Sequence, residues 1–166
     1  MALEVSKVLV SAGSNYLRGH NFVKGLNWLQ ESSKIIRISH IYSSQDIQKK
    51  TSFYWNLVLI VLVNLPNNAV KDYLKSIEDK CLRDRKSKNS RVSLDLDILG
   101  FYSIDGWKFG RDCCRLLKQK VCYLSSSMDD LGIDLKNQSD QERLATRCVG
   151  KIKNSNILTG KSVFKI

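Results

Sequence analysis

The sequence predicts an α+β fold in which helices pack on an antiparallel, ferredoxin-like sheet. The first observation is the order of the expected elements: strand, helix, strand, strand, helix, strand, as in a ferredoxin-like sandwich. The second is the length, since 166 residues are enough for one domain with a buried core. We place this domain at residues 1–147 and assign residues 148–166 to a basic tail, which has lysines but no acidic residue.

Hydrophobic patterning places three strands and a helix in the first 64 residues. A period of two is typical of a half-buried strand, a short apolar run of a fully buried strand, and helical spacing of an amphipathic helix. These patterns predict a strand over 5–11, a helix over 21–32, a strand over 34–44 and a central strand over 53–64. In the 34–44 strand, Ile36, Ile38, His40 and Tyr42 are expected to share one face.

The second half begins at Pro66, which suits the start of a helix with Asn67 or Asn68 as its cap. The apolar stripe of this helix consists of Val70, Tyr73, Leu74, Ile77 and Cys81. The later patterns predict a strand over 93–99, a turn at 105–106, a short strand over 107–109, a helix or loop over 111–123 and a helix over 141–149.

Apolar and acidic residues alternate between Leu94 and Ile98. This period of two predicts a strand whose leucines face the core, with Asp95 and Asp97 together on the other face. A cation would relieve the repulsion between these two carboxylates, and such hard oxygen ligands suit Mg²⁺. The basic stretch from Arg83 to Arg91 precedes them and suits a polyphosphate. The alternative is a solvated strand face beside a solvated loop.

Composition favours anionic partners, because the formal net charge is +11. The N-terminus has an early acid and no long apolar core, so we expect no signal peptide. The longest apolar run, 57–63, is too short to span a bilayer. We therefore expect a cytoplasmic monomer that binds no membrane. Five cysteines, an odd number without a Cys-x-x-Cys motif, argue for reduced thiols rather than a zinc site or disulfide framework.

Several short motifs occur in a fixed order along residues 5–135. They are Gly13-Ser14-Asn15, Ser39 to Tyr42 followed by Ser44, Tyr54-Trp55-Asn56, Ile77-Glu78, Arg83-Asp84-Arg85 and Leu94-Asp95-Leu96-Asp97-Ile98-Leu99. Through this ordered set the chain resembles the 6-hydroxymethyl-7,8-dihydropterin pyrophosphokinase family of folate biosynthesis. The resemblance implies Mg²⁺-dependent transfer of pyrophosphate from ATP to the hydroxymethyl group of a reduced pterin, so ATP and this pterin are the expected partners.

The resemblance also implies roles for individual residues. Asp95 and Asp97 would hold two Mg²⁺ ions that bridge the ATP phosphates. Ser44, Tyr54 and Asn56 would belong to the pterin pocket. The arginines that would contact or gate the triphosphate are Arg83, Arg85 and Arg91. The residues expected near the nucleotide, or supplying positive charge to it, are Glu78, Arg111, Arg115 and Lys118.

The chain departs from the family pattern in ways that leave other functions open. The family has a Pro-His-Pro segment near positions 108–116, whereas this chain has no histidine after His40 and no proline after Pro66. The alternative is therefore a catalytically impaired homologue that binds nucleotides or serves in regulation. An RNA-recognition module has the same element order but needs stacking aromatics on its first and third strands. Val8-Leu9-Val10 has none, so we do not expect nucleic acid to bind.

Overall fold

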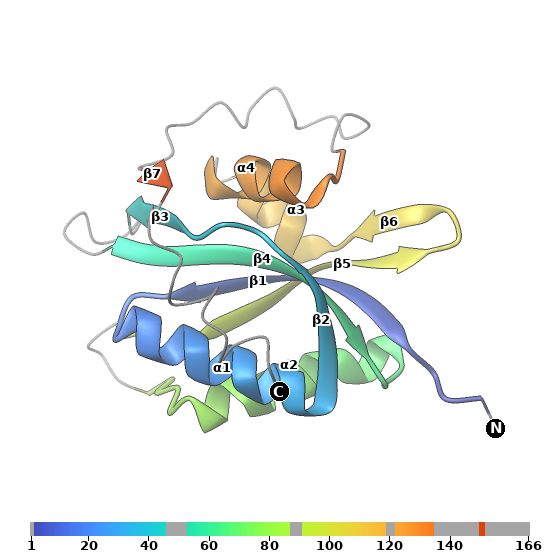
Figure 1. Ribbon diagram of the computed structural model, residues 1–166, viewed down its shortest axis with the longest axis horizontal. Helices are drawn as coiled ribbons and strands as arrows, with labels where there is room; N and C mark the ends of the chain where they lie inside the picture. The colour runs from blue at the N-terminus through green and yellow to red at the C-terminus, as the bar shows by residue number, and fades with distance from the viewer. Residues whose placement is uncertain (1, 46–52, 87–90, 119–121, 135–149, 152–166) are drawn as a thin grey trace.

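The computed structural model describes residues 2–45, 53–86, 91–118, 122–134 and 150–151, which form one seven-stranded sheet with helices on both faces (Figure 1). The elements are β1 (Ser6–Ser14), α1 (Arg18–Ser32), β2 (Ser33–Ile38), β3 (Tyr42–Gln45), β4 (Phe53–Val63), α2 (Asn67–Lys80), β5 (Asp95–Ser103), β6 (Gly106–Phe109), α3 (Arg111–Lys118), α4 (Cys122–Leu131) and β7 (Gly150–Lys151). Among the described residues, no helix is long and apolar enough to cross a bilayer.

The sheet confirms the predicted ferredoxin-like topology. Its strand order is β6-β5-β1-β4-β3-β7, and β2 also pairs with β4. All six strand pairings that define the sheet are antiparallel. The long strand β1 lies between β4 and β5, so residues from three distant parts of the chain become neighbours at its centre. β7, which falls in the segment that we assigned to the basic tail, pairs with β3.

Two hydrophobic layers hold the helices against the sheet. One lies between the sheet and α1 with α2, and its buried residues include Val8, Phe22, Leu29, Leu59, Leu74 and Leu96. The other lies between the opposite face and α3 with α4, and includes Leu9, Val58, Leu99, Leu124 and Met128. Figure 1 shows the two helix pairs on opposite sides of the sheet. The C-terminal helices thus cover the face that α1 and α2 leave open.

The strand predicted over 34–44 is divided into two, and its facing pattern was wrong. β2 ends at Ile38 and β3 begins at Tyr42. The pairing of β2 with β4 shifts register between Ile35 and Arg37. The shift places an extra residue in β2 and reverses the alternation beyond it. Ile38 therefore packs with Ile35 on the core of α1 and α2, while Ile36 is exposed.

The helix ends also refine the sequence predictions. Pro66, rather than an asparagine, occupies the N-cap of α2, and no side chain caps the helix. The Asn67 side chain is engaged elsewhere, because its Oδ1 accepts a hydrogen bond from Ser6 Oγ at 2.6 Å. The region for which a helix or a loop was left open contains a helix, α3, and α4 then begins at Cys122. The helix predicted over 141–149 lies outside the described residues.

Candidate functional site

The N-terminal half of β5 forms a free edge of the sheet in the described structure. β6 pairs with Gly100–Ser103 alone, so no strand covers the segment from Asp95 to Leu99 on its outer side. A side chain of α2 accepts one backbone hydrogen bond from this edge: the Leu96 N–H donates to Glu78 Oε1 at 2.7 Å. The Leu96 N–H is thus bonded to a carboxylate, while Asp95 and Asp97 on the same strand line a cavity.

Asp95 and Asp97 lie where the alternation predicts. Leu94 and Leu96 are buried in the layer under α1 and α2, so the two aspartates point to the opposite face. Burial, reinforced by the neighbouring carboxylates of Asp95 and Asp112 and opposed by Arg115, raises the pKa of Asp97 to about 7. The aspartates therefore form a crowded, partly buried acidic pair whose repulsion a cation would relieve.

A cavity of about 350 Å³ opens over this edge. It is lined by Lys71, Leu74, Lys75, Glu78, Arg85, Asp95, Leu96, Asp97, Ile98, Gly110, Arg111 and Asp112. Five residues predicted for the phosphate and metal site therefore meet in one place, and they come from α2, the segment after it, β5 and α3. The cavity combines an acidic strand edge with cations on the surrounding elements.

Glu78 connects three parts of this site. It is only 5% exposed and bonds both the Leu96 amide and the Arg85 guanidinium. Burial raises the pKa of Glu78, although the hydrogen bond from Leu96 opposes the shift. Arg85 also pairs with Asp79 at the end of α2. The acid predicted to lie near the nucleotide therefore holds one of the predicted triphosphate arginines at the wall of the cavity.

The three residues predicted for the pterin pocket also lie together. Asn56 Nδ2 donates a hydrogen bond to Ser44 Oγ at 2.6 Å, and Ser44 is the cross-strand partner of Tyr54. Gly13 makes room for this group, because a Cβ at that position would lie 3.2 Å from Asn56 Oδ1 and 3.7 Å from Tyr54 Cδ1. A side chain at position 13 would crowd the amide of Asn56.

The sheet register shows where the residues predicted for the pterin pocket lie relative to the aspartates. Gly13 pairs with Asn56 on one side and with Asp95 on the other. Directly paired residues point to the same face, and neighbouring strands are about 4.8 Å apart, so Asn56 and Asp95 lie on one face roughly 10 Å from each other. Because Gly13 has no side chain, nothing rises from β1 between them at this position.

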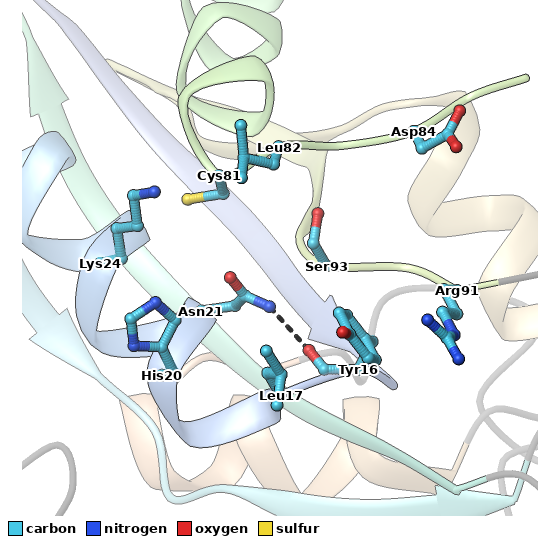
Figure 2. Close-up of a pocket in the computed structure, with 10 residues that line it drawn as sticks. All are labelled: Tyr16, Leu17, His20, Asn21, Lys24, Cys81, Leu82, Asp84, Arg91 and Ser93. Atoms are coloured by element: carbon cyan, nitrogen blue, oxygen red, sulfur yellow. Dashed lines mark hydrogen bonds between the residues drawn. The ribbon is translucent and has the colours of Figure 1, made fainter. Parts of the chain in front are cut away.

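The other predicted residues lie further away. Arg91 is stacked over the Tyr16 ring at 4.8 Å from its centroid, and it lines a second cavity (Figure 2) rather than the one over Asp95. Arg83 Nη1 donates to the Arg91 carbonyl at 3.5 Å. Arg115 pairs with Asp112 at 3.7 Å and acts on Asp97 through its charge. Lys118 is the last residue of α3.

Sequence reasoning missed Lys71 and Lys75, which line the cavity. Their spacing from Glu78 is i, i+4 and i+7, which places all three on one face of α2. This signal was present, but the apolar stripe of the helix was the only pattern considered. Tyr123 was also missed: its hydroxyl lies 2.8 Å from Ser11 Oγ, and Ser11 pairs with Asp97. Burial raises the pKa of Tyr123, so it stays neutral beneath the aspartates.

The donor chemistry of the edge fits Mg²⁺. Two carboxylates side by side match this ion, which binds one or two protein oxygens and keeps its other positions for water and phosphate. Within the described ranges, no group of three or more His, Cys, Asp or Glu side chains could hold a metal ion.

Fold and site together define a ferredoxin-like α+β protein with an acidic strand edge, surrounded by cations, and a buried polar cluster around the Asn56 amide. Comparison with known families carries the assignment further. The family model described as 7,8-dihydro-6-hydroxymethylpterin-pyrophosphokinase (HPPK) matches residues 9–126. This is well over half of the chain, and the protein belongs to that family. No curated protein matches the sequence.

Proposed function

We propose that this protein transfers pyrophosphate from ATP to 6-hydroxymethyl-7,8-dihydropterin in folate biosynthesis and releases AMP. The observation that carries the proposal is the row across the sheet in which Gly13 separates Asn56 from Asp95. It supports an acceptor pocket and a metal–phosphate site side by side on one face. Family membership supports the same reaction.

The residues of the acidic edge have a direct role in this proposal. Asp95 and Asp97 would hold Mg²⁺, which supplies neutralisation of the phosphate charge when bound. Lys71, Lys75 and Arg111 line the same cavity and would hold phosphate oxygens from the other side. Phosphoryl-type transfer depends on such positioning and electrostatic stabilisation more than on covalent help from the protein.

The pterin pocket would orient the acceptor. The Asn56 amide offers both a donor and an acceptor to a planar, polar ring system, and its bond to Ser44 fixes its orientation. Tyr54 supplies an aromatic surface on the same side. A pterin held there would have its hydroxymethyl group directed along the sheet toward Asp95, within the span of two strands.

A second function is supported by specific features. The chain lacks the histidine of the Pro-His-Pro segment, and Arg85 is engaged by Glu78 and Asp79. A homologue that binds Mg²⁺–ATP without transferring pyrophosphate would retain the acidic edge and show both features. Such a protein would act in nucleotide binding or regulation.

An AMP-release assay separates the two functions. ATP, Mg²⁺ and hydroxymethyl-dihydropterin are incubated with the wild-type chain, and AMP is measured with and without the pterin. Pterin-dependent AMP supports the kinase. Metal-dependent ATP binding by calorimetry without AMP release supports the binding protein. Absence of both overturns the two proposals together.

A further inference from the structure

A second cavity lies on the α1 and α2 side of the sheet, away from the aspartate face. Its volume is about 260 Å³, and its lining residues come from the turn before α1, from α1, from the end of α2 and from the segment that leads into β5. Figure 2 shows the side chains of these four segments arranged around a common space. The cavity belongs to neither the acidic edge nor the pterin group.

Both non-glycine residues with positive φ in the described structure line this cavity. They are Leu17, with φ 44°, and Leu82, with φ 57°. L-residues rarely adopt this left-handed conformation. At Leu82 it ends α2 in a Schellman motif, in which the Arg83 N–H donates to the Glu78 carbonyl and the Leu82 N–H to the Asp79 carbonyl. The side chains of Leu17 and Leu82 are also 58% and 80% exposed. Two exposed apolar side chains that line one cavity suit an apolar group that covers them.

The cavity has two cationic side chains in its lining. Lys24 and Arg91 line it, and Arg91 is held in place by the Tyr16 ring. The N-terminus of α1 lies here, with no acidic residue in its first turn and no side-chain cap. This end of the helix carries a partial positive charge. The carboxylate of Asp84 also lines the cavity, but it accepts the Lys86 amide at 2.9 Å.

Ser93 indicates that a ligand oxygen belongs in this cavity. The residue is 6% exposed, and its Oγ is buried with no hydrogen-bond partner. Figure 2 shows the Ser93 hydroxyl in the middle of the lining side chains, between Leu82 and Arg91. Buried hydroxyls in folded proteins normally have a partner. An anionic oxygen in the cavity would accept this hydroxyl proton.

We propose that the cavity binds a phosphate monoester with a compact apolar body. The phosphate oxygens would accept hydrogen bonds from Ser93, Lys24 and the first amides of α1, and the apolar body would pack on Leu17 and Leu82. The site would link the end of α2 to the segment that leads into β5. Arg83 and Arg85 lie in the chain between these two segments. It does not depend on the pyrophosphokinase reaction.

The probe for this site is phenyl phosphate, titrated into the full chain without Mg²⁺ and followed by amide NMR and calorimetry. We expect saturable binding with shifts at the amides of Leu17 to His20 and of Ser93. Lys24→Ala should weaken binding about tenfold, the scale of a charge-assisted hydrogen bond. The matched control is Lys34→Ala, on exposed β2, which should leave the affinity unchanged.

Two further variants test the role of each part. Ser93→Ala should weaken phenyl phosphate several-fold without lowering the Tm, because the hydroxyl has no partner in the free protein. Leu82→Gly should weaken phenyl phosphate but not inorganic phosphate, since glycine adopts the positive φ without strain and only the apolar contact is lost. Equal weakening of both probes by Leu82→Gly would overturn the apolar part of the proposal.

Three results would overturn the site as a whole. The first is the absence of saturable binding at millimolar phenyl phosphate. The second is loss of binding in Asp97→Asn, or competition by ATP, either of which would place the probe at the acidic edge. The third is an equal loss in Lys24→Ala and Lys34→Ala, which would indicate attraction to net charge alone. None of these results depends on whether the protein releases AMP.

Discussion

The two faces of the sheet are built differently. Toward α1 and α2, the central strand β1 presents Val8, Val10 and Ala12, all buried in an apolar layer. Toward α3 and α4, the same strand presents Leu9, then Ser11 and Gly13, and Ser11 bonds Tyr123. The neighbouring strands also place polar side chains on this face: Asn56 on β4 and the aspartates on β5. Both faces carry an apolar layer under their helices, and the α3 and α4 face also carries the polar groups of the candidate site.

This comparison explains how one short sheet serves both purposes. Each strand alternates its side chains, so a single strand can contribute to the core and to the site at once. On the α1 and α2 face the strands contribute buried apolar side chains. The opposite face contains groups whose charged forms are disfavoured by burial and by one another, such as Asp97 with its pKa of about 7. The following variants separate the two faces, beginning with the largest expected effect.

Leu29→Ala should have the largest effect on stability. Leu29 lies in α1 and is fully buried in the apolar layer. Its truncation removes buried methyl groups and leaves a cavity, which lowers the free energy of unfolding by about 2–5 kcal/mol. Denaturant unfolding measures the change. At temperatures where the variant is folded, calorimetry should find Mg²⁺–ATP affinity within twofold of wild type; a large loss would show that the two faces are not separable.

Asp97→Ala should have the largest effect on the proposed activity. Removal of one preorganised metal ligand should reduce Mg²⁺-dependent ATP binding or turnover on the order of a hundredfold. Calorimetric titration of ATP with and without Mg²⁺ measures this. If the variant binds Mg²⁺–ATP as well as wild type does, the acidic edge is a solvated strand face and not a metal site.

The same residue predicts an unusual dependence of stability on pH. In the metal-free protein, the folded-state pKa of Asp97 is raised from 3.8 to about 7. The folded state therefore holds this proton more tightly than the unfolded state, and stability decreases as pH rises from about 4 to 7. Asp97→Asn should remove this loss, so the variant becomes the more stable protein at neutral pH. Urea unfolding at several pH values tests the sign, and saturating Mg²⁺ should shrink the difference.

Asn56→Ala should affect one ligand and spare the other. Because Asn56 is predicted to contact the pterin and does not line the cavity over Asp95, we expect pterin affinity to fall about tenfold while ATP affinity stays nearly unchanged. Fluorescence titration with the pterin and calorimetry with ATP give the two numbers. A drop in Tm with both affinities unchanged would instead mean that Asn56 only completes the network with Ser44.

Tyr42→Phe should have the smallest effect, confined to the junction between α4 and the sheet. The Tyr42 hydroxyl donates to Asp130 Oδ2 at 2.6 Å, and the same oxygen accepts the His40 amide at 3.0 Å. The variant should lose about 1 kcal/mol of stability. Burial alone would raise the pKa of Asp130, but these hydrogen bonds outweigh it and lower the pKa.

That lowered pKa sets where the Tyr42→Phe effect should appear. A carboxyl with a depressed folded-state pKa stabilises the fold above its unfolded value and loses this contribution as pH falls through the folded value. The difference in free energy of unfolding between wild type and Tyr42→Phe should therefore have its full size at neutral pH and decrease in acid. Unfolding measured across the acidic range shows this, and a difference that grows in acid would contradict it.

The sequence by itself determined those features that depend on residues a few positions apart. The alternation from Leu94 to Ile98 decided both the strand and the side to which Asp95 and Asp97 point. The stripe from Val70 to Cys81 decided the buried face of α2. In each case the period of the strand or helix decides which side chains share a face, whatever the element later packs against.

Tertiary structure alone decided which faces meet. The register shift in β2 depends on its pairing with β4, and the left-handed conformations of Leu17 and Leu82 depend on where the chain must turn between packed elements. Lys71 and Lys75 line the cavity over the aspartates because α2 lies beside β5, while Arg91, only four residues from Asp95, lines a different cavity. Contacts between distant segments are set by strand order and helix placement, and no local period encodes them.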